Sequence, residues 1–172
     1  MKIEVWYDFT EESYKQIKEI DKLIRDFKID NLDLLYRSYP LNYEENIKAH
    51  QVSHLAKKYF CQHEFILNLF SKLETKPFEN QTIKEAALEE YLDEKQIDEV
   101  LNSNKYEEQV LTNKENAVYK KIFMIPHVRL EGKIKLNGFH NIEALVEAIE
   151  KLKITYTINE HCEGEHCGRK KA

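Results

Sequence analysis

Glycine and proline are scarce in this chain, which has only four glycines and three prolines among its 172 residues. These residues break helices and form turns, so their scarcity favours a mainly helical protein. No apolar run approaches the length that crosses a membrane, and no basic segment followed by an apolar run opens the chain. We therefore expect no membrane contact, no signal peptide and a cytoplasmic location, where the three cysteines would stay mostly reduced.

The chain also lacks the excess of basic residues that binding to nucleic acid requires. Its formal net charge is −5, whereas phosphate backbones are bound by basic surfaces, so we expect no nucleic-acid partner. Hydrophobic residues make up 42% and charged residues 33%, which is typical of a soluble globular protein rather than of a disordered one. At this length we expect one globular domain with room for an inserted subdomain.

The first fourteen residues, MKIEVWYDFTEESY, predict a strand that runs directly into a helix. β-Branched and aromatic residues dominate positions 3–9. Thr10 and Ser13 are both candidates for the helix N-cap, and the spacing from Ser13 to Gln16 is that of a capping box. A strand end that meets a helix N-terminus is a place where α/β proteins put their chemistry. This junction is therefore the first candidate site.

The next segments predict a helix, a strand and then a long helical block. Apolar residues recur at helical spacing over 14–27, polar residues end that helix at 28–30, and alternation over 32–40 predicts a second strand. Residues 42–119 carry only helix signals. Two capping boxes lie in that block, Thr82-x-x-Glu85 and Asp93-x-x-Gln96.

A hairpin signal comes after the helical block, because apolar residues alternate on both sides of Glu131-Gly132. Asn141 then caps a last predicted helix, which ends near Leu152. The order is β-α-β, a helical block, then β-β-α, which is an α/β thioredoxin-like fold with an inserted all-helical subdomain. We expect a thioredoxin-like domain from 1–41 and 120–158, a helical insertion from 42–119, and a flexible tail from 159–172.

Four short segments, taken in order, carry a resemblance to one family. They are KIEVW with Asp8-Phe9, YRSYPL at 36–41, Ala49-His50 with Leu55-Ala56, and Ile125-Pro126 followed by Leu136-Asn137-Gly138. The chain is similar to DsbA-like thioredoxin-fold proteins, in particular to their cytoplasmic FrnE-like branch. The resemblance implies thiol–disulfide oxidoreduction as the family function. It also implies that Pro126 is cis and faces the active site.

The chain departs from this family at the position of its catalytic cysteines. Members that exchange disulfides carry Cys-x-x-Cys after the Asp-Phe-x, whereas Glu11-Glu12-Ser13-Tyr14 stands here. Only a thiolate forms a mixed disulfide, so direct dithiol exchange at this helix end is excluded. What remains is a predicted cleft that binds a protein or peptide partner, or a small thiol, as an adaptor would. Its predicted residues are Asp8, Phe9, Glu11, Ser13, Tyr14, Ile125 and Pro126.

A related branch offers a second interpretation of the same helix end. In kappa-class glutathione transferases and 2-hydroxychromene-2-carboxylate isomerases, a serine orients the thiolate of glutathione, and Ser13-Tyr14 resembles their trailing Ser-Tyr. Glu11 and Glu12 count against this interpretation, because carboxylates repel an anionic thiolate. Binding of glutathione therefore stays the weaker alternative.

The tail from His161 to Cys167 is the second candidate site. Cys162 and Cys167 form a Cys-x4-Cys pair that resembles one in some FrnE-type proteins, so the pair is a tentative catalytic redox centre. Two histidines, His161 and His166, stand beside them and complete a zinc ligand set of unusual spacing. The plainest interpretation is a tail with incidental cysteines. We expect no cofactor, with glutathione and zinc as the weaker alternatives.

The remaining candidates have structural explanations. Cys61 stands at a helix junction beside an aromatic residue and is expected to be a structural thiol. His50 and His54 have the i, i+4 spacing of a metal-binding pair, but no third ligand is recognisable. We therefore predict that the two histidines lie on a solvated helix face, and we predict no metal site there.

Overall fold

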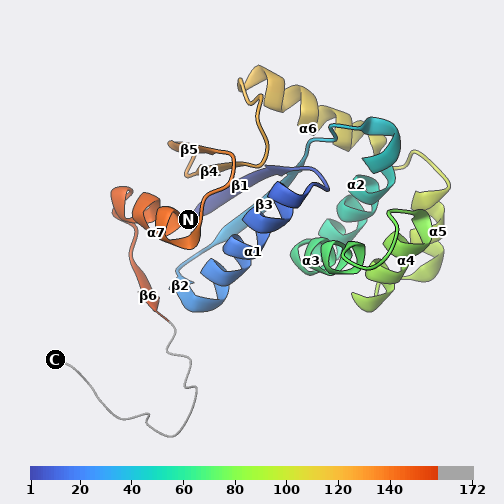
Figure 1. Cartoon of the computed structure of the whole chain (residues 1–172), viewed down its shortest axis with the longest axis horizontal. Coiled ribbons are helices and arrows are strands. Elements are labelled where there is room, and N and C mark those ends of the chain that lie inside the picture. The colour runs from blue at the N-terminus through green and yellow to red at the C-terminus, as the bar shows by residue number, and fades with distance from the viewer. Residues whose placement is uncertain (159–172) are drawn as a thin grey trace, which may run out of the picture.

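A computed structural model of the chain describes residues 1–158. Seven helices and six strands lie in this part of the chain (Figure 1). The helices are α1 (Glu11–Asp26), α2 (Tyr43–Lys58), α3 (Gln62–Leu73), α4 (Asn80–Glu89), α5 (Glu94–Leu101), α6 (Glu107–Tyr119) and α7 (Ile142–Lys151). The strands are β1 (Lys2–Tyr7), β2 (Phe27–Ile29), β3 (Asp33–Ser38), β4 (His127–Leu130), β5 (Ile134–Asn137) and β6 (Tyr156–Ile158).

A four-stranded sheet with the order β3-β1-β4-β5 forms the centre of the fold. β1 is parallel to β3 and antiparallel to β4, and β4 and β5 form the predicted hairpin. The crossover between the parallel strands passes through α1, as the β-α-β pattern requires. The chain therefore has the predicted α/β, thioredoxin-like architecture, with α2 to α6 standing between β3 and β4 in the sequence.

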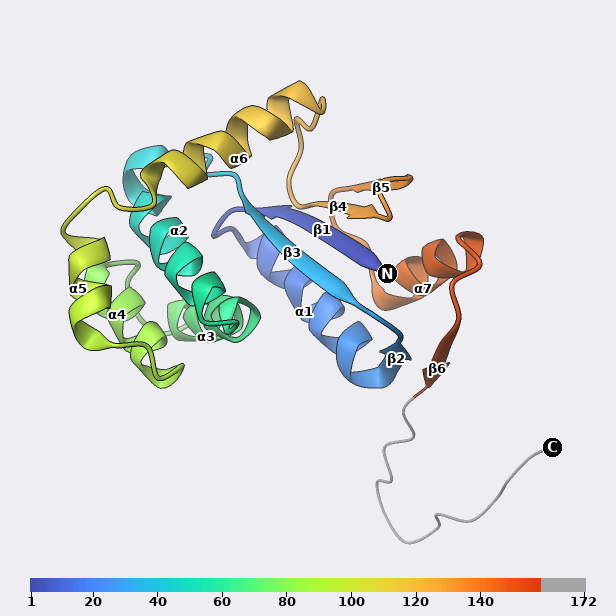
Figure 2. The same ribbon diagram turned by 180° about the vertical axis from the view of Figure 1, so that it is seen from behind.

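The two faces of β1 are buried against different helices. Ile3, Val5 and Tyr7 are fully buried in the main core together with the apolar side chains of α1. Trp6 points the other way, because successive strand residues face opposite sides, and it packs with Ala117 of α6. In Figures 1 and 2, α6 accordingly lies on the opposite side of the sheet from α1. β1 is the buried centre from which the candidate site extends.

Several predicted helix starts are confirmed, and others are wrong. Asp93 and Asn141 cap α5 and α7, each accepting from the backbone N–H three residues on. α1 begins three residues earlier than its apolar spacing predicts, because Thr10 is its N-cap. The capping box at Thr82 is wrong: Thr82 is buried inside α4, where its hydroxyl donates to the Pro77 carbonyl at 2.8 Å.

A second, two-stranded sheet was missed by the sequence patterns. β2 and β6 pair antiparallel, with Phe27 opposite Ile158 and Ile29 opposite Tyr156. The polar residues expected to end the first helix thus include a strand. Each strand has only three residues, which is too short to display a period.

The scarcity of glycine leaves non-glycine residues in the left-handed backbone region at helix ends. Phe60 comes after α2 with φ of 61°, and its N–H and that of Cys61 bond to carbonyls in the last turn of the helix. Tyr91 comes after α4 in the same way with φ of 58°. Glycine is the usual residue at this position, because a Cβ atom there costs conformational energy. Both aromatic side chains are 96% exposed, so the core does not hold them there.

We expect Phe60→Gly to raise the free energy of unfolding by about 1 kcal/mol, because glycine removes the left-handed penalty and no buried contact is lost. Urea denaturation measures the change. Lys58→Gly, in the right-handed last turn of the same helix, is the matched control and is expected to lower stability by about 0.5–1 kcal/mol. A destabilised Phe60→Gly protein would show that the ring contributes packing energy.

Candidate functional site

The candidate site lies where β1 passes into α1. The Thr10 side chain accepts a hydrogen bond from the Ser13 backbone N–H at 3.3 Å and so caps the helix. Glu11 and Glu12 occupy the first turn, where both are exposed and where their charges suit the helix dipole. The first turn of α1 thus carries two solvent-exposed carboxylates.

Asp8 is the buried centre of the junction, and its carboxylate lies within hydrogen-bond distance of Leu41, Asn46 and His50. Its Oδ2 accepts from the Leu41 N–H at 2.8 Å, the Asn46 amide lies 2.8 Å from both oxygens, and His50 Nε2 lies 2.9 Å from Oδ1. Burial alone would raise the pKa of Asp8, but the hydrogen bond and charge of His50 and the Leu41 and Phe9 N–H groups outweigh burial and lower it. Asp8 therefore joins the end of β1 to α2 as a buried carboxylate.

The prediction of a solvated face for His50 and His54 is wrong. His50 is fully buried against Asp8, and His54 is largely buried. His54 Nε2 lies 3.3 Å from both the Ser38 hydroxyl and the Asn113 amide, and its ring stacks on Tyr106. The two histidines thus take different buried partners and do not form a pair.

Burial, with the nearby charges of His50, Lys57 and Arg37, lowers the pKa of His54 to about 4. The unfolded chain takes up a proton near pH 6.5 and the folded chain near pH 4, so stability falls as the pH drops through this window. We expect the low pKa of His54 to reduce the free energy of unfolding by about 2 kcal/mol as the pH falls from about 6.5 to about 4.5. Urea unfolding at several pH values measures this loss, which His54→Gln is expected to remove. Equal pH dependence in both proteins would contradict the assignment.

Ser13 lies inside the junction and not at its surface. Its Oγ accepts from the Asp8 N–H at 3.4 Å and from the Thr10 hydroxyl at 3.1 Å, and the side chain is fully buried. The capping box that was predicted from Ser13 to Gln16 is wrong. Gln16 Oε1 instead accepts from the His140 N–H at 2.7 Å and so holds the segment before α7 against α1.

Phe9 and Tyr14 pack against the inserted helices. The Phe9 ring lies 5.3 Å from that of Phe70 and 5.6 Å from that of Phe78. Tyr14 stacks on Phe70 at 4.8 Å, and burial and Glu74 raise the pKa of its phenol. These two predicted cleft residues thus form the boundary of the junction toward α3, and neither stands alone in solvent.

The Ile125–Pro126 peptide bond is cis, and it lies beside the same junction. Trp6 pairs with His127 in the antiparallel β1–β4 ladder, so continuing the register by one residue puts buried Pro126 opposite Tyr7. The Pro126 carbonyl accepts from the Gly138 N–H at 2.8 Å. The proline thus stands at the end of β1 from which α1 begins.

Four exposed apolar side chains, which we call the apolar rim, belong to the three loops that border this place. They are Leu41, Phe123, Met124 and Phe139, and they are between 47% and 73% exposed. The backbone of Leu41 is bonded to Asp8, and Phe139 precedes the residue that is bonded to Gln16 of α1. The Met124 sulfur lies beside Gly138. Exposed apolar patches mark surfaces that bind a partner, so these loops are the candidate binding surface.

Asn46 and Ser53 were missed by the sequence patterns. Asn46 bonds to Asp8, and Ser53 accepts from Gln62 at 3.0 Å and lies 2.8 Å from the Tyr7 hydroxyl. Together with His50 they form a buried polar stripe at i, i+4 and i+7 along α2. In the sequence, this stripe appears only as three uncharged polar residues at helical spacing. A solvent-exposed polar stripe has the same spacing, so the pattern does not reveal burial.

The predicted tail residues Cys162 and Cys167, with His161 and His166, lie outside the described residues. Cys61 is half-buried, its thiol donates to the Ala56 carbonyl at 3.6 Å, and burial raises the pKa of the thiol. Residues 1–158 contain no group of three or more potential metal ligands placed to share an ion. No helix in that part of the chain is long and apolar enough to cross a membrane.

Comparison with known proteins gives one family match and several related structures. The family model of the DSBA-like thioredoxin domain matches residues 2–150. A probable DsbA oxidoreductase from Streptomyces coelicolor superposes with a TM-score of 0.77 at 17% identity, over 98% of this chain and 96% of its own. A 2-hydroxychromene-2-carboxylate isomerase superposes with a TM-score of 0.73 at 16% identity, over 89% and 96%.

A thiol-disulfide exchange protein from Wolbachia pipientis, α-DsbA2, superposes with a TM-score of 0.69 at 18% identity, over 88% of this chain and 81% of its own. No curated protein matches the chain. At these identities the structural likenesses establish the shared fold.

Proposed function

This chain belongs to the DSBA-like thioredoxin domain family, and we propose that it is a member that binds polypeptide at the family's site without exchanging disulfides there. The proposed cleft lies between Asp8–Tyr14 and Ile125-Pro126, within the apolar rim. The observation that carries the proposal is the rim itself, whose exposed apolar side chains lie on the loops beside a helix N-terminus without a cysteine.

The chemistry of the junction supports binding rather than catalysis. The first cysteine of the chain is Cys61, so no thiolate stands at the start of α1. Two exposed glutamates occupy the first turn instead, and Glu11 pairs with Lys15 at 2.6 Å. The apolar rim beside this helix end still offers a peptide side-chain contacts. We infer a cytoplasmic adaptor-like protein of the FrnE-like branch whose partner is an extended protein segment.

Binding of an unfolded peptide tests this function. Fluorescently labelled, alkylated insulin B chain has no free thiol, so its anisotropy reports non-covalent association. We expect Met124→Asp with Phe139→Asp to weaken binding about tenfold or more, because charges replace the centre of the apolar rim. Tyr91→Asp places the same charge at an exposed aromatic residue in the helical block and is the control. Unchanged affinity in the rim variant would sink the proposal.

The first alternative is a residual oxidoreductase that works through Cys162 and Cys167. It places the redox pair on the tail, and the junction then needs no thiol. Insulin reduction separates it from the adaptor: activity that disappears in Cys162→Ser supports the alternative, whereas no activity in either protein supports the adaptor. Zinc on the tail is tested by metal analysis of protein purified without chelator.

The second alternative is a glutathione-dependent transferase or isomerase, and the likeness to 2-hydroxychromene-2-carboxylate isomerase favours it. Ser13 would have to offer its hydroxyl proton to the thiolate of glutathione, from a buried position next to two carboxylates. This alternative predicts that immobilised glutathione retains the protein and that Ser13→Ala abolishes retention. No binding at millimolar glutathione would remove it.

A further inference from the structure

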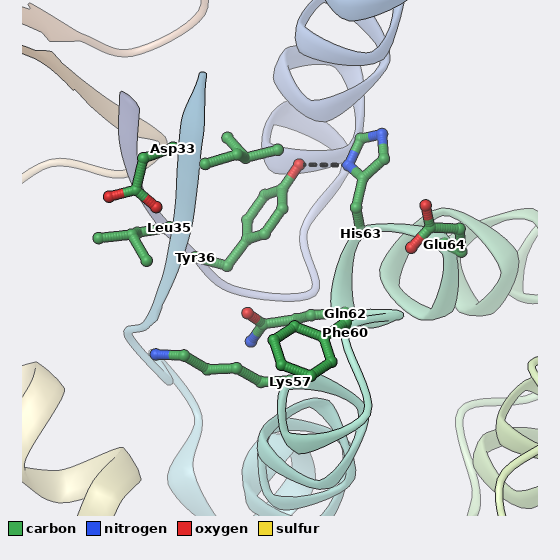
Figure 3. Close-up of a pocket in the computed structure, with 9 residues that line it drawn as sticks. Asp33, Leu35, Tyr36, Lys57, Phe60, Gln62, His63 and Glu64 are labelled. Atoms are coloured by element: carbon green, nitrogen blue, oxygen red, sulfur yellow. Dashed lines mark hydrogen bonds between the residues drawn. The ribbon is translucent and has the colours of Figure 1, made fainter. Parts of the chain in front are cut away.

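Two cavities border the turn that joins α2 to α3, and they differ in charge. One, of about 340 Å³, lies beside β3 (Figure 3), and Lys57 lines it together with Asp33 and Glu64, so its charges favour no single kind of ligand. The other, of about 320 Å³, lies between the α2–α3 turn and the α4–α5 turn, and we call it the acidic cavity. Its lining residues are Tyr59, Cys61, Glu90, Tyr91, Leu92 and Asp93. None of them belongs to the junction or to the apolar rim, so a ligand bound here is independent of peptide binding there.

The acidic cavity contains two carboxylates whose hydrogen-bond partners are neutral. The Asn68 amide donates to Glu90 Oε1 at 3.2 Å, and the Gln96 backbone N–H donates to Asp93 Oδ1 at 3.0 Å. These contacts hold the two side chains in place, but a neutral donor does not cancel a charge. In the described part of the chain neither carboxylate forms an ion pair.

The neighbouring carboxylates outside the acidic cavity do have counter-ions. Glu89 pairs with Lys72, and Glu94 pairs with Lys84 at 2.9 Å. Each of these glutamates stands next in the sequence to a carboxylate that lines the cavity. The local sequence therefore supplies lysines to the surface on both sides of the α4–α5 turn, and the cavity carboxylates differ from their neighbours in having none.

The electrostatic potential in the acidic cavity is negative. Burial raises the pKa of the Cys61 thiol, and the charges of Glu90 and Glu64 raise it further. A place that disfavours a thiolate for this reason favours a cation. Among residues 1–158 no lysine, arginine or histidine lines the cavity. The charges that surround the cavity thus select a cationic ligand.

Two tyrosines add aromatic rings to the lining. The Tyr59 hydroxyl donates to Gln96 Oε1 at 2.8 Å, which fixes its ring against α5, and Lys58 Nζ already lies 5.4 Å from the centre of that ring. The Tyr91 ring is 96% exposed and stands at φ of 58°, where glycine would be more stable. Aromatic faces attract organic cations, because the ring quadrupole is negative there.

We propose that the acidic cavity binds an alkylammonium group. The ammonium lies beside Glu90 and Asp93, and its alkyl chain packs against Leu92 and the Tyr91 ring. A divalent metal ion is the poorer occupant, because it needs more oxygen ligands than two carboxylates provide, and residues 1–158 contain no group of three potential ligands. A free amine and a lysine side chain of another protein offer the same group, so the chemistry is shared and the test separates the two sources.

An NMR titration of the full chain with n-butylammonium chloride tests the site, at an ionic strength held constant with sodium chloride. We expect saturable amide shifts at Cys61, Tyr91 and Leu92, with a Kd of about 10 mM or lower. The control is 1-butanol, which has nearly the same shape without the charge and is expected not to bind. The bound cation offsets the charge of Glu90, so we also expect it to lower the pKa of Cys61, which the Cβ shift of that residue reports.

The doubly blocked amino acid acetyl-lysine-methylamide separates the two sources of the ammonium group. Its side chain ends in the same alkylammonium, but its backbone is that of a residue within a polypeptide. Binding as tight as that of n-butylammonium assigns the site to a lysine of a partner protein. Binding of n-butylammonium alone assigns it to a free amine. Both results support the proposed chemistry.

Two pairs of substitutions show whether the cavity carboxylates bind the cation. Glu90→Gln with Asp93→Asn keeps an oxygen for each hydrogen bond, and asparagine is a good N-cap, so folding is preserved. We expect this variant to weaken binding of n-butylammonium about tenfold. Glu89→Gln with Glu94→Gln removes the same charge from just outside the cavity and is expected to change the Kd less than about twofold.

The contribution of the aromatic ring is tested at Tyr91. Tyr91→Gly is expected to weaken binding about threefold although it relieves the left-handed backbone and so makes the protein more stable. Tyr91→Phe keeps the ring and is expected to keep the affinity of the parent. A loss of binding through unfolding is therefore distinguishable from a loss of the ring.

Three outcomes overturn the proposal. The first is the absence of saturable shifts at the cavity with about 100 mM n-butylammonium, roughly ten times the expected Kd. The second is an equal response to 1-butanol, which would mean that the cavity takes up alkyl chains and ignores charge. The third is equal weakening by the two double variants, because the cation would then respond to the general charge of this surface rather than to a site.

Discussion

Glu11→Cys with Tyr14→Cys is expected to turn the protein into a disulfide reductase at least about 100-fold more active than the parent. The two cysteines are introduced into a parent protein in which Cys162 and Cys167 are replaced by serine, so only the junction is tested. Residue 11 begins α1, where the helix dipole and free N–H groups lower the pKa of a thiol. Turbidity from reduced insulin measures the activity.

A control with the same cysteine spacing isolates the effect of the helix end. Lys15→Cys with Lys18→Cys places two exposed thiols three residues apart on α1, one turn beyond its start. These thiols lack the free N–H groups of the first turn, so we expect background activity. Equal activity in the two double variants, or no activity at residues 11 and 14, would mean that the junction is not a thioredoxin-type site.

Asp8→Asn is expected to lower the free energy of unfolding by about 3–5 kcal/mol, a larger loss than we expect at any exposed position of the junction. The carboxylate is fully buried and is bonded to Leu41, Asn46 and His50. The asparagine side chain has one acceptor oxygen where the carboxylate has two. Its NH₂ group would face the hydrogen-bond donors of these partners. Urea unfolding at about pH 7 measures the loss, since Asp8 is then fully ionised in the parent protein.

The loss is expected to shrink in acid. The pKa of Asp8 is lower in the folded protein than its ordinary value of 3.8, so its ionisation contributes stability above that value. This contribution disappears as the pH falls through the folded pKa, and the two proteins then converge. Glu11→Gln, which removes an exposed carboxylate from the same junction, is the control and is expected to lower stability far less than Asp8→Asn at neutral pH. An Asp8→Asn protein as stable as the parent would contradict the buried network.

The fold was predictable because apolar residues recur at clear helical or strand spacing in its main elements. Residues 14–27 repeat apolar side chains at helical spacing, and 32–40 alternate, which gave α1 and β3. Asp93 and Asn141 were predictable as caps because their side chains bond within three residues. The pair β2 and β6 was not predictable, since it joins two short segments from opposite ends of the described chain through three residues each.

The candidate site was predictable in place but not in its contacts. The strand-to-helix junction and Pro126 were both identified from local residues and from the family resemblance. The partners of Asp8 lie between 33 and 42 residues away in the sequence, so no local pattern reveals them. The same distance explains the error on His50: a histidine on a helix looks solvated until the buried carboxylate opposite it is known. The apolar rim was missed because its members come from three loops.

The most direct test of a binding site without a nucleophile is an NMR titration of the labelled protein with alkylated insulin B chain. The peptide carries no free thiol, so any response is non-covalent. The proposed function predicts amide shifts at Thr10, Leu41, Met124 and Phe139, on both sides of the junction. Shifts confined to other surfaces, or none at saturating peptide, would contradict it.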